Sequence, residues 1–191
     1  DSGYPGVRLL DRSVLATDLA GLRRDGDWGT FFVLGRMHQS RDWTFAGTQD
    51  ATVSLFTLYA YERVLGRVLP DSPNPLLAPA QRSMRVDFYV ASGRNYARDW
   101  SGFTAMETYL QLVEAFRWPA FRALFLEYRA LAERDRPASE EARAQQWFLR
   151  SSRAFGRNLS PFYERWGLPV SASTRTSTGS LPAWTTMPAR P

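Results

Sequence analysis

The segment from Thr48 to Gly66, TQDATVSLFTLYAYERVLG, constrains the fold more than any other part of the sequence. Thr48 is a residue type that favours a helix N-cap, and Gly66 is the type that favours a helix C-terminal cap. The segment therefore predicts one helix. Its apolar side chains lie nearly all round that helix and not on a single stripe, which indicates that the helix is deeply buried.

Most of the remaining chain also has apolar residues at helical spacing. These segments are residues 11–24, 28–39, 104–116, 118–134, 139–155 and 160–167. Thr104 and Glu107 have the spacing of a capping box, and Pro119 lies where a first helical turn tolerates proline. Only RVDFYVA, residues 85–91, alternates like a strand. We therefore predict a mostly α (α+β) fold class with one or two short strands.

Two segments lack such periodicity. Residues 70–81 form a proline-rich connection, and residues 171–191 are rich in Ser, Thr and Pro, which predicts an extended coil. We expect residues 1–170 to form one domain and residues 171–191 to be a C-terminal extension. The chain begins DSGYPGV without a methionine, so we expect a processed or truncated polypeptide.

Composition excludes several classes of protein. The 191 residues are 44% hydrophobic and 14% aromatic, which suits a globular chain with a real core. No apolar run reaches the roughly 18 residues of a membrane span. The absence of cysteine excludes disulfides, thiolate metal sites and a cysteine nucleophile, and it leaves the cellular compartment open.

The charge is positive but mixed. The net charge is +5 and the pI is about 10.0, and every basic side chain except one histidine is an arginine. The arginines alternate with acids, as in EYRALAERDR and SEEARAQQ, which is typical of solvated helix faces. We do not expect a nucleic-acid ligand.

The stretch WGTFFVLGRMHQ, residues 28–39, has the outline of the HExxH helix of zinc peptidases. In that motif, positions i and i+4 place two histidines on one face, and the adjacent glutamate activates a zinc-bound water. Here His38 is the only histidine in the chain. The outline is present without the residues that carry the chemistry.

Five blocks of sequence occur in a distinctive order. They are GYPGV, WGTFFVLGRMHQ, DWTFAGTQDATVSLFTLYAYERVLG, AMETYLQLVEAFRWPAFRALFLEY and NLSPFYERWGLPVS. In this order the chain resembles an M60-like (enhancin-type) metallopeptidase domain, most closely its degenerate branch, the TRPM8 channel-associated factors. The resemblance runs from Gly3 to Trp184 and implies the helical C-terminal part of a gluzincin-like zinc-metallopeptidase domain. Because such domains carry a β-rich portion upstream, it also implies that other polypeptide completes this chain.

The active pattern of this family reads W-G-x-x-H-E-x-G-H-N-H-Q. It places the two zinc histidines at Phe32 and Arg36, the general base at Val33 and a further zinc ligand at Asp50. Phenylalanine has no lone pair to donate, arginine remains a cation and valine cannot take a proton. The resemblance therefore implies no catalytic residue, no metal ligands and no cofactor.

Two functions follow from the resemblance. The favoured one is a non-catalytic pseudo-peptidase module with a binding or assembly role, whose partner is other polypeptide, a glycoprotein or a glycan. The alternative is an active secreted zinc metallopeptidase that acts on glycoproteins, with its site completed elsewhere. Either function favours an extracellular or cell-surface location.

We further expect Arg36 and Asp50 to form an ion pair where zinc would lie. In a buried pair, loss of Asp50 would cost about 3–5 kcal/mol. The other interpretation is that Arg36 extends to solvent and Asp50 caps its helix.

A candidate ligand cleft completes the sequence-based predictions. Its members are His38, Trp43, Trp100, Glu107 and Trp166. Each also has a structural interpretation: a scaffold histidine, core tryptophans, and a glutamate that belongs to a capping box.

Overall fold

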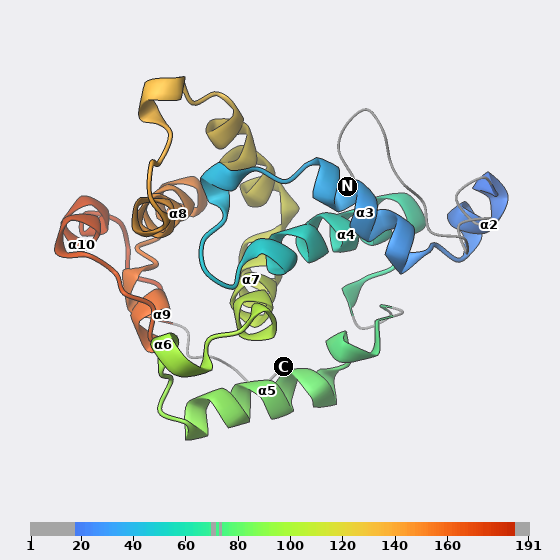
Figure 1. The fold of residues 1–191 in the computed structure, drawn as a ribbon, viewed down its shortest axis with the longest axis horizontal. Helices are drawn as coiled ribbons and strands as arrows, with labels where there is room; N and C mark the ends of the chain where they lie inside the picture. Colours follow the sequence, from blue (N-terminus) through green and yellow to red (C-terminus); the bar gives the residue numbers. More distant parts are fainter. Residues whose placement is uncertain (1–17, 70–71, 73, 186–191) are drawn as a thin grey trace.

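The computed structural model describes residues 18–69, 72 and 74–185, and these are mostly helical (Figure 1). The α-helices are α2 (Leu19–Arg24), α3 (Trp28–Met37), α4 (Gln49–Leu65), α5 (Pro79–Ala91), α6 (Tyr96–Asp99), α7 (Gly102–Arg129), α8 (Glu140–Phe155), α9 (Ser160–Arg165) and α10 (Ala172–Thr178). Short 3-10 turns are η1 (Arg41–Trp43), η3 (Pro75–Leu77) and η4 (Glu133–Asp135). β-pairing within the described ranges is limited to an isolated bridge between Asn158 and Ala183. The mostly α fold class is confirmed.

Helix α4 is the central element, and it packs against both α3 and α7 (Figure 1). Leu55 and Tyr61 are each 1% exposed, so the predicted deep burial is confirmed. Gly66 ends the helix in the left-handed conformation with φ 66°. Thr48 holds the N-cap position, but its hydroxyl bonds to the backbone of Phe45 and not to the helix.

Helix α7 is interrupted at Arg117, whose φ of 62° and ψ of 172° are not helical. The cause lies two residues later, because Pro119 lacks an N–H and its ring clashes with the preceding turn of a helix. Such backbone angles are strained in a residue with a side chain. The two helices predicted around this point are thus the two halves of α7.

The N-terminus of α7 differs from the sequence-based prediction. Ser101 is the N-cap, and its hydroxyl accepts a hydrogen bond from the Thr104 amide at 3.2 Å. The predicted capping box of Thr104 and Glu107 is therefore wrong, and Glu107 lies in the second turn of the helix, free for another role.

The core is aromatic and centres on α8. Trp147 and Phe148 are fully buried, and the Trp147 ring lies 4.9 Å from the ring of Tyr109 on α7. Trp43, which follows α3, packs its ring 5.8 Å from that of Tyr128. The side chain of Arg143 ties α8 to this segment by donating to the Thr44 carbonyl at 2.6 Å.

The predicted strand at residues 85–91 is wrong, since these residues form the second half of α5. Val86 and Tyr89 are β-formers, yet with Arg82 they are spaced i, i+4 and i+7 and make the buried stripe of a helix. Pro79 begins that helix, where its missing N–H costs nothing. A short apolar run fits both the two-residue repeat of a strand and the 3.6-residue repeat of a helix. Tertiary packing here favours the helix.

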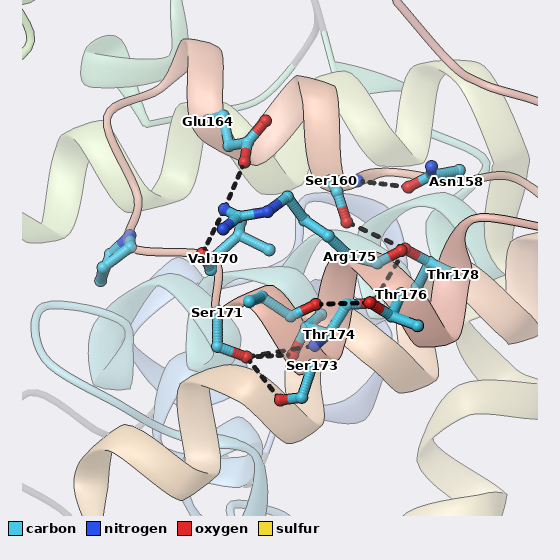
Figure 2. Close-up of polar contacts among 12 residues, drawn as sticks. Asn158, Ser160, Glu164, Val170, Ser171, Ser173, Thr174, Arg175, Thr176 and Thr178 are labelled. Atoms are coloured by element: carbon cyan, nitrogen blue, oxygen red, sulfur yellow. Dashed lines mark hydrogen bonds and ion pairs between the residues drawn. The ribbon is translucent and has the colours of Figure 1, made fainter.

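The predicted coil at residues 171–191 is also wrong for its first part, which forms α10 (Figure 2). Ser171 caps this helix by accepting a hydrogen bond from the Thr174 amide at 3.1 Å. Arg175 donates to a Glu164 carboxylate oxygen at 2.9 Å, and the Ser160 and Thr178 hydroxyls are 3.0 Å apart in a buried contact. Residues 186–191 lie outside the described part of the chain, as do residues 1–17 with most of the first predicted helix.

No helix among the described residues is long and apolar enough to cross a membrane.

Buried tyrosines make the stability of the fold sensitive to alkaline pH. Burial raises the pKa of Tyr61 and of Tyr89 to about 12, and it also raises the pKa values of Tyr109, Tyr128 and Tyr163. In the unfolded chain these groups ionise near pH ~10. Above that pH the unfolded state loses protons that the folded state keeps, so stability falls as pH rises.

We therefore expect the free energy of unfolding to fall steadily as the pH rises from about 10 to about 12. Urea unfolding across this range, followed by circular dichroism, measures it. Stability that stays level through the range would contradict the burial of the tyrosines.

Candidate functional site

The positions that the family pattern assigns to zinc lie on one face of α3 and at the start of α4. Asp27 starts this helix by accepting a hydrogen bond from the Thr30 amide at 2.6 Å. One turn separates Phe32 from Arg36, and the guanidinium of Arg36 lies 5.1 Å from the centre of the Phe32 ring. Arg36 Nη2 donates to Asp50 Oδ1 at 3.0 Å, so the predicted ion pair is confirmed.

The pair is exposed, so the cost given above for a buried pair does not apply. The side chains of Arg36 and Asp50 are 50% and 66% exposed. Asp50 lies in the first turn of α4, where a carboxylate also favours the positive end of the helix dipole. Solvent therefore screens the pair, and its contribution to stability is small.

Replacing Asp50 with alanine is accordingly expected to lower the free energy of unfolding by about 0.2–1 kcal/mol. Raising the salt concentration should reduce this difference, because exposed charges are screened. Thermal unfolding of Asp50→Ala and of the unchanged chain at low and high salt measures the effect. A loss several times larger would mean that the carboxylate is buried.

The donors present do not fit zinc. Phe32 offers a hydrocarbon ring and Arg36 offers a cation, where a tetrahedral site needs imidazole or another lone-pair donor. In the part of the chain that the structure describes, no group of three or more His, Cys, Asp or Glu residues could hold a metal ion. The one remaining carboxylate, on Asp50, is bonded to a guanidinium.

A cavity of about 470 Å³ lies on another face of α3, bounded also by α4 and the second half of α7. The lining positions are Phe31, Leu34 and Gly35 on α3 and His38 at its C-cap, which share one face by helical spacing. None of them coincides with Phe32, Val33 or Arg36. Helix α3 thus presents Phe32, Val33 and Arg36 on one face and the cavity wall on another.

The predicted cleft residues do not form one site. His38 and Trp43 line the cavity, although Trp43 is only 2% exposed. Trp100 lies apart, donating its indole N–H to the Ala46 carbonyl at 2.8 Å. Trp166 is 1% exposed and stacks on Tyr89, with ring centres 5.9 Å apart, so it has no free face for a sugar.

Glu107 belongs to a buried charge network between α5 and α7. Arg82 donates from Nε and Nη2 to the two Glu107 oxygens at 3.0 and 2.7 Å, and from Nη1 to Glu114 at 2.8 Å. Its hydrogen bonds to these carboxylates raise the pKa of Arg82 although burial opposes this. Sequence reasoning missed the network because Arg82 fell between a predicted connection and a predicted strand.

Comparison with known proteins decides which scaffold this is. Residues 2–167 match the family described as Peptidase M60, enhancin and enhancin-like. The chain belongs to the peptidase M60 family. The resemblance noted in the sequence is confirmed.

Curated relatives of this M60 chain include TRPM8 channel-associated factors. The chain is 37% identical over 190 residues to factor 2 of Bos taurus, and 37% identical over 185 residues to factor 1 of Homo sapiens. These alignments cover 99% and 96% of the chain but 20% of each relative. The M60 chain therefore spans about a fifth of the length of these relatives.

A solved structure shares the fold. It is a crystal structure of a functionally unknown conserved protein mutant from Bacillus anthracis str. Ames, with a TM-score of 0.73 and 26% sequence identity. The match covers 89% of this chain and 34% of that one.

Two residues that fit the M60 sequence pattern, Gly35 and Gln39, stabilise this fold. A Cβ added at Gly35 would lie 2.9 Å from the Val53 carbonyl oxygen, so glycine allows α3 to approach α4 closely. Gln39 donates to the Gln49 carbonyl at 2.7 Å and accepts from the Trp43 indole at 2.9 Å. Gly35 and Gln39 thus hold α3 and the segment after it against α4.

Proposed function

We propose that this M60 chain is a non-catalytic module with a binding or assembly role. The observation that carries the proposal is the Arg36–Asp50 ion pair beside Phe32. A guanidinium at a metal-ligand position repels a divalent cation and pairs with the carboxylate that remains. Metal binding there would require breaking the pair and would still lack imidazole donors.

The proposal extends to the chemistry of peptide hydrolysis. A general base is typically worth about 10²–10⁴-fold in rate, and Val33 supplies none. A metal ion would polarise the scissile carbonyl, and no donor set for it is present at the former site. We therefore propose that the chain lacks both the general base and the metal ion that the mechanism of the family requires.

We propose polypeptide as the partner, either another part of the same protein or a separate chain. The supporting surface is the outer face of α5, where Met84 and Phe88 are spaced i and i+4 and are 58% and 71% exposed. Phe103 at the start of α7 is 48% exposed. Relatives named for association with a channel make a channel-linked assembly one candidate. Glycan stacking is less well supported, because Trp43 and Trp166 are buried.

Zinc content and peptidase activity test the proposal. Elemental analysis of the purified chain should find no stoichiometric zinc, and assays on casein and on a mucin-type glycoprotein should show no hydrolysis. The matched control is the variant F32H/V33E/R36H/D50E, which restores the family pattern at all four positions. This variant shows whether the scaffold can hold zinc when the family residues are present, and whether the elemental analysis detects the bound zinc.

One equivalent of zinc in the unchanged chain, lost on substitution of Asp50, would overturn the proposal. Together with hydrolysis of the glycoprotein, it would favour the alternative of an active zinc metallopeptidase.

A further inference from the structure

The cavity between α3, α4 and α7 has the size and lining of a small-molecule site. Its volume of about 470 Å³ falls among those of ligand pockets, roughly 300–1,000 Å³. Its walls carry Phe31 of α3, Leu55 and Phe56 of α4, and Phe121, Phe125 and Leu126 of α7. An apolar cavity of this kind holds water poorly and favours an apolar occupant.

The cavity has a buried floor and an open mouth. Leu55 and Phe121 are each 1% exposed, whereas Leu34 of α3 and Leu126 of α7 are 44% and 61% exposed. The exposed leucines show that the lining continues to the molecular surface. An apolar chain could therefore enter from solvent and extend inward.

The ionisable side chains at the cavity are all of basic residue types. Two are the cations Arg122 and Arg129, the third is His38, and the part of the lining that the structure describes contains no acid. Arg129 Nη2 lies 3.4 Å from His38 Nδ1, and since arginine can only donate, the histidine nitrogen accepts. Positive charge thus collects where the apolar lining meets solvent.

Some arginines of the fold pair with carboxylates, and others do not. Arg82, Arg36 and Arg175 each contact a carboxylate. Across residues 18–69, 72 and 74–185, no carboxylate lies within ion-pair distance of Arg122 or Arg129. A guanidinium is well suited to a carboxylate, which it can bind through two parallel hydrogen bonds. The missing counter-charge is one that a ligand can supply.

We propose that this cavity binds a single-chain anionic amphiphile, a medium-chain fatty acid, with the alkyl chain among the aromatic side chains and the carboxylate at Arg122 and Arg129. The two arginines lie two turns apart on one face of α7, about 10 Å along the helix axis. Their long side chains can converge on one head group. The inference does not rest on the proposed absence of zinc, because Phe32, Val33 and Arg36 lie on another face of α3 and Asp50 does not line the cavity.

Calorimetric titration of the purified chain with octanoate, decanoate and dodecanoate, each below its micelle concentration, tests the proposal. Affinity should rise about three- to fourfold for each added methylene that is buried. Dodecanol and dodecyltrimethylammonium supply neutral and cationic heads on the same chain. We expect dodecanol to bind more weakly than dodecanoate, and the cationic amphiphile not to saturate.

The variants Arg122→Gln and Arg129→Gln separate the head group from the cavity. Together they should weaken dodecanoate binding by about tenfold or more, since a hydrogen bond to a charged group is worth about 1.5–3 kcal/mol. Dodecanol affinity should not change, which also shows that the variant remains folded. Arg153→Gln, at an exposed arginine on α8 away from the cavity lining, is the matched control and should leave both affinities unchanged.

Three outcomes would overturn the proposal. Equal binding of the cationic amphiphile, or dodecanoate binding that the double variant leaves intact, would indicate non-specific apolar association. Absence of saturable binding by every chain length would indicate that polypeptide fills the cavity.

Discussion

Replacing Arg82 with methionine is expected to lower the free energy of unfolding by about 3–5 kcal/mol. The Arg82 side chain is 5% exposed and its partner Glu107 is 1% exposed. Without the guanidinium, Glu107 is left as a buried carboxylate that has lost both of its charged hydrogen bonds. Urea unfolding followed by circular dichroism measures the loss.

Two control variants separate charge pairing from packing. Glu114→Gln removes the third contact, but Glu114 is 46% exposed, so the cost should stay below about 1 kcal/mol. In Arg82→Met/Glu107→Leu no uncompensated charge from this pair remains, and we expect the double variant to recover at least half of the single-variant loss. Losses that simply add would show that the two residues are not coupled, and would contradict the network.

Gly167→Ala is expected to cost about 2–5 kcal/mol, for two reasons that add. Its φ of 73° lies in the left-handed region, which costs a residue with a side chain about 1–2 kcal/mol. An added Cβ would also lie 2.2 Å from the Arg94 carbonyl oxygen, and such overpacking typically costs about 1–3 kcal/mol. The contact is with backbone, so one of the two segments must move.

Gly156→Ala is the matched control for Gly167→Ala. Gly156 has a φ of 65°, and an added Cβ would meet nothing within 4 Å. Only the backbone cost of about 1–2 kcal/mol should remain. Equal losses in the two variants, measured by thermal unfolding, would show that the chain around Arg94 absorbs the clash.

Sequence reasoning succeeded where local signals and packing agree. The central helix was predicted from its all-round apolar composition and its final glycine, and α4 has both features. It failed where one pattern fits two structures. Residues 85–91 satisfy strand alternation and helix spacing equally, and the packing of α5 against α7, which no local window contains, decided between them. The hydroxyls after Ser171 indicated coil, yet several of them cap or support α10.

The candidate site was predictable only in part. The resemblance to a peptidase family predicted that Arg36 and Asp50, which are distant in sequence, form an ion pair. The structure contains this ion pair. Their exposure depends on what surrounds them in three dimensions, which no sequence pattern specifies. Sequence reasoning placed His38 and Trp43 in a cleft but missed the rest of the cavity, because its other aromatic residues come from α3, α4 and α7 and have the spacing of ordinary core positions.

The break in α7 at Arg117 has a consequence for cooperativity. The first half of the helix carries Glu107 and Glu114, and the second half carries Arg122 and Arg129 at the cavity. Because the backbone ladder is interrupted between them, the two halves can open with different free energies, as separate units of amide hydrogen exchange. The wall of the cavity can then loosen to admit a ligand while the buried charges beside α5 stay protected.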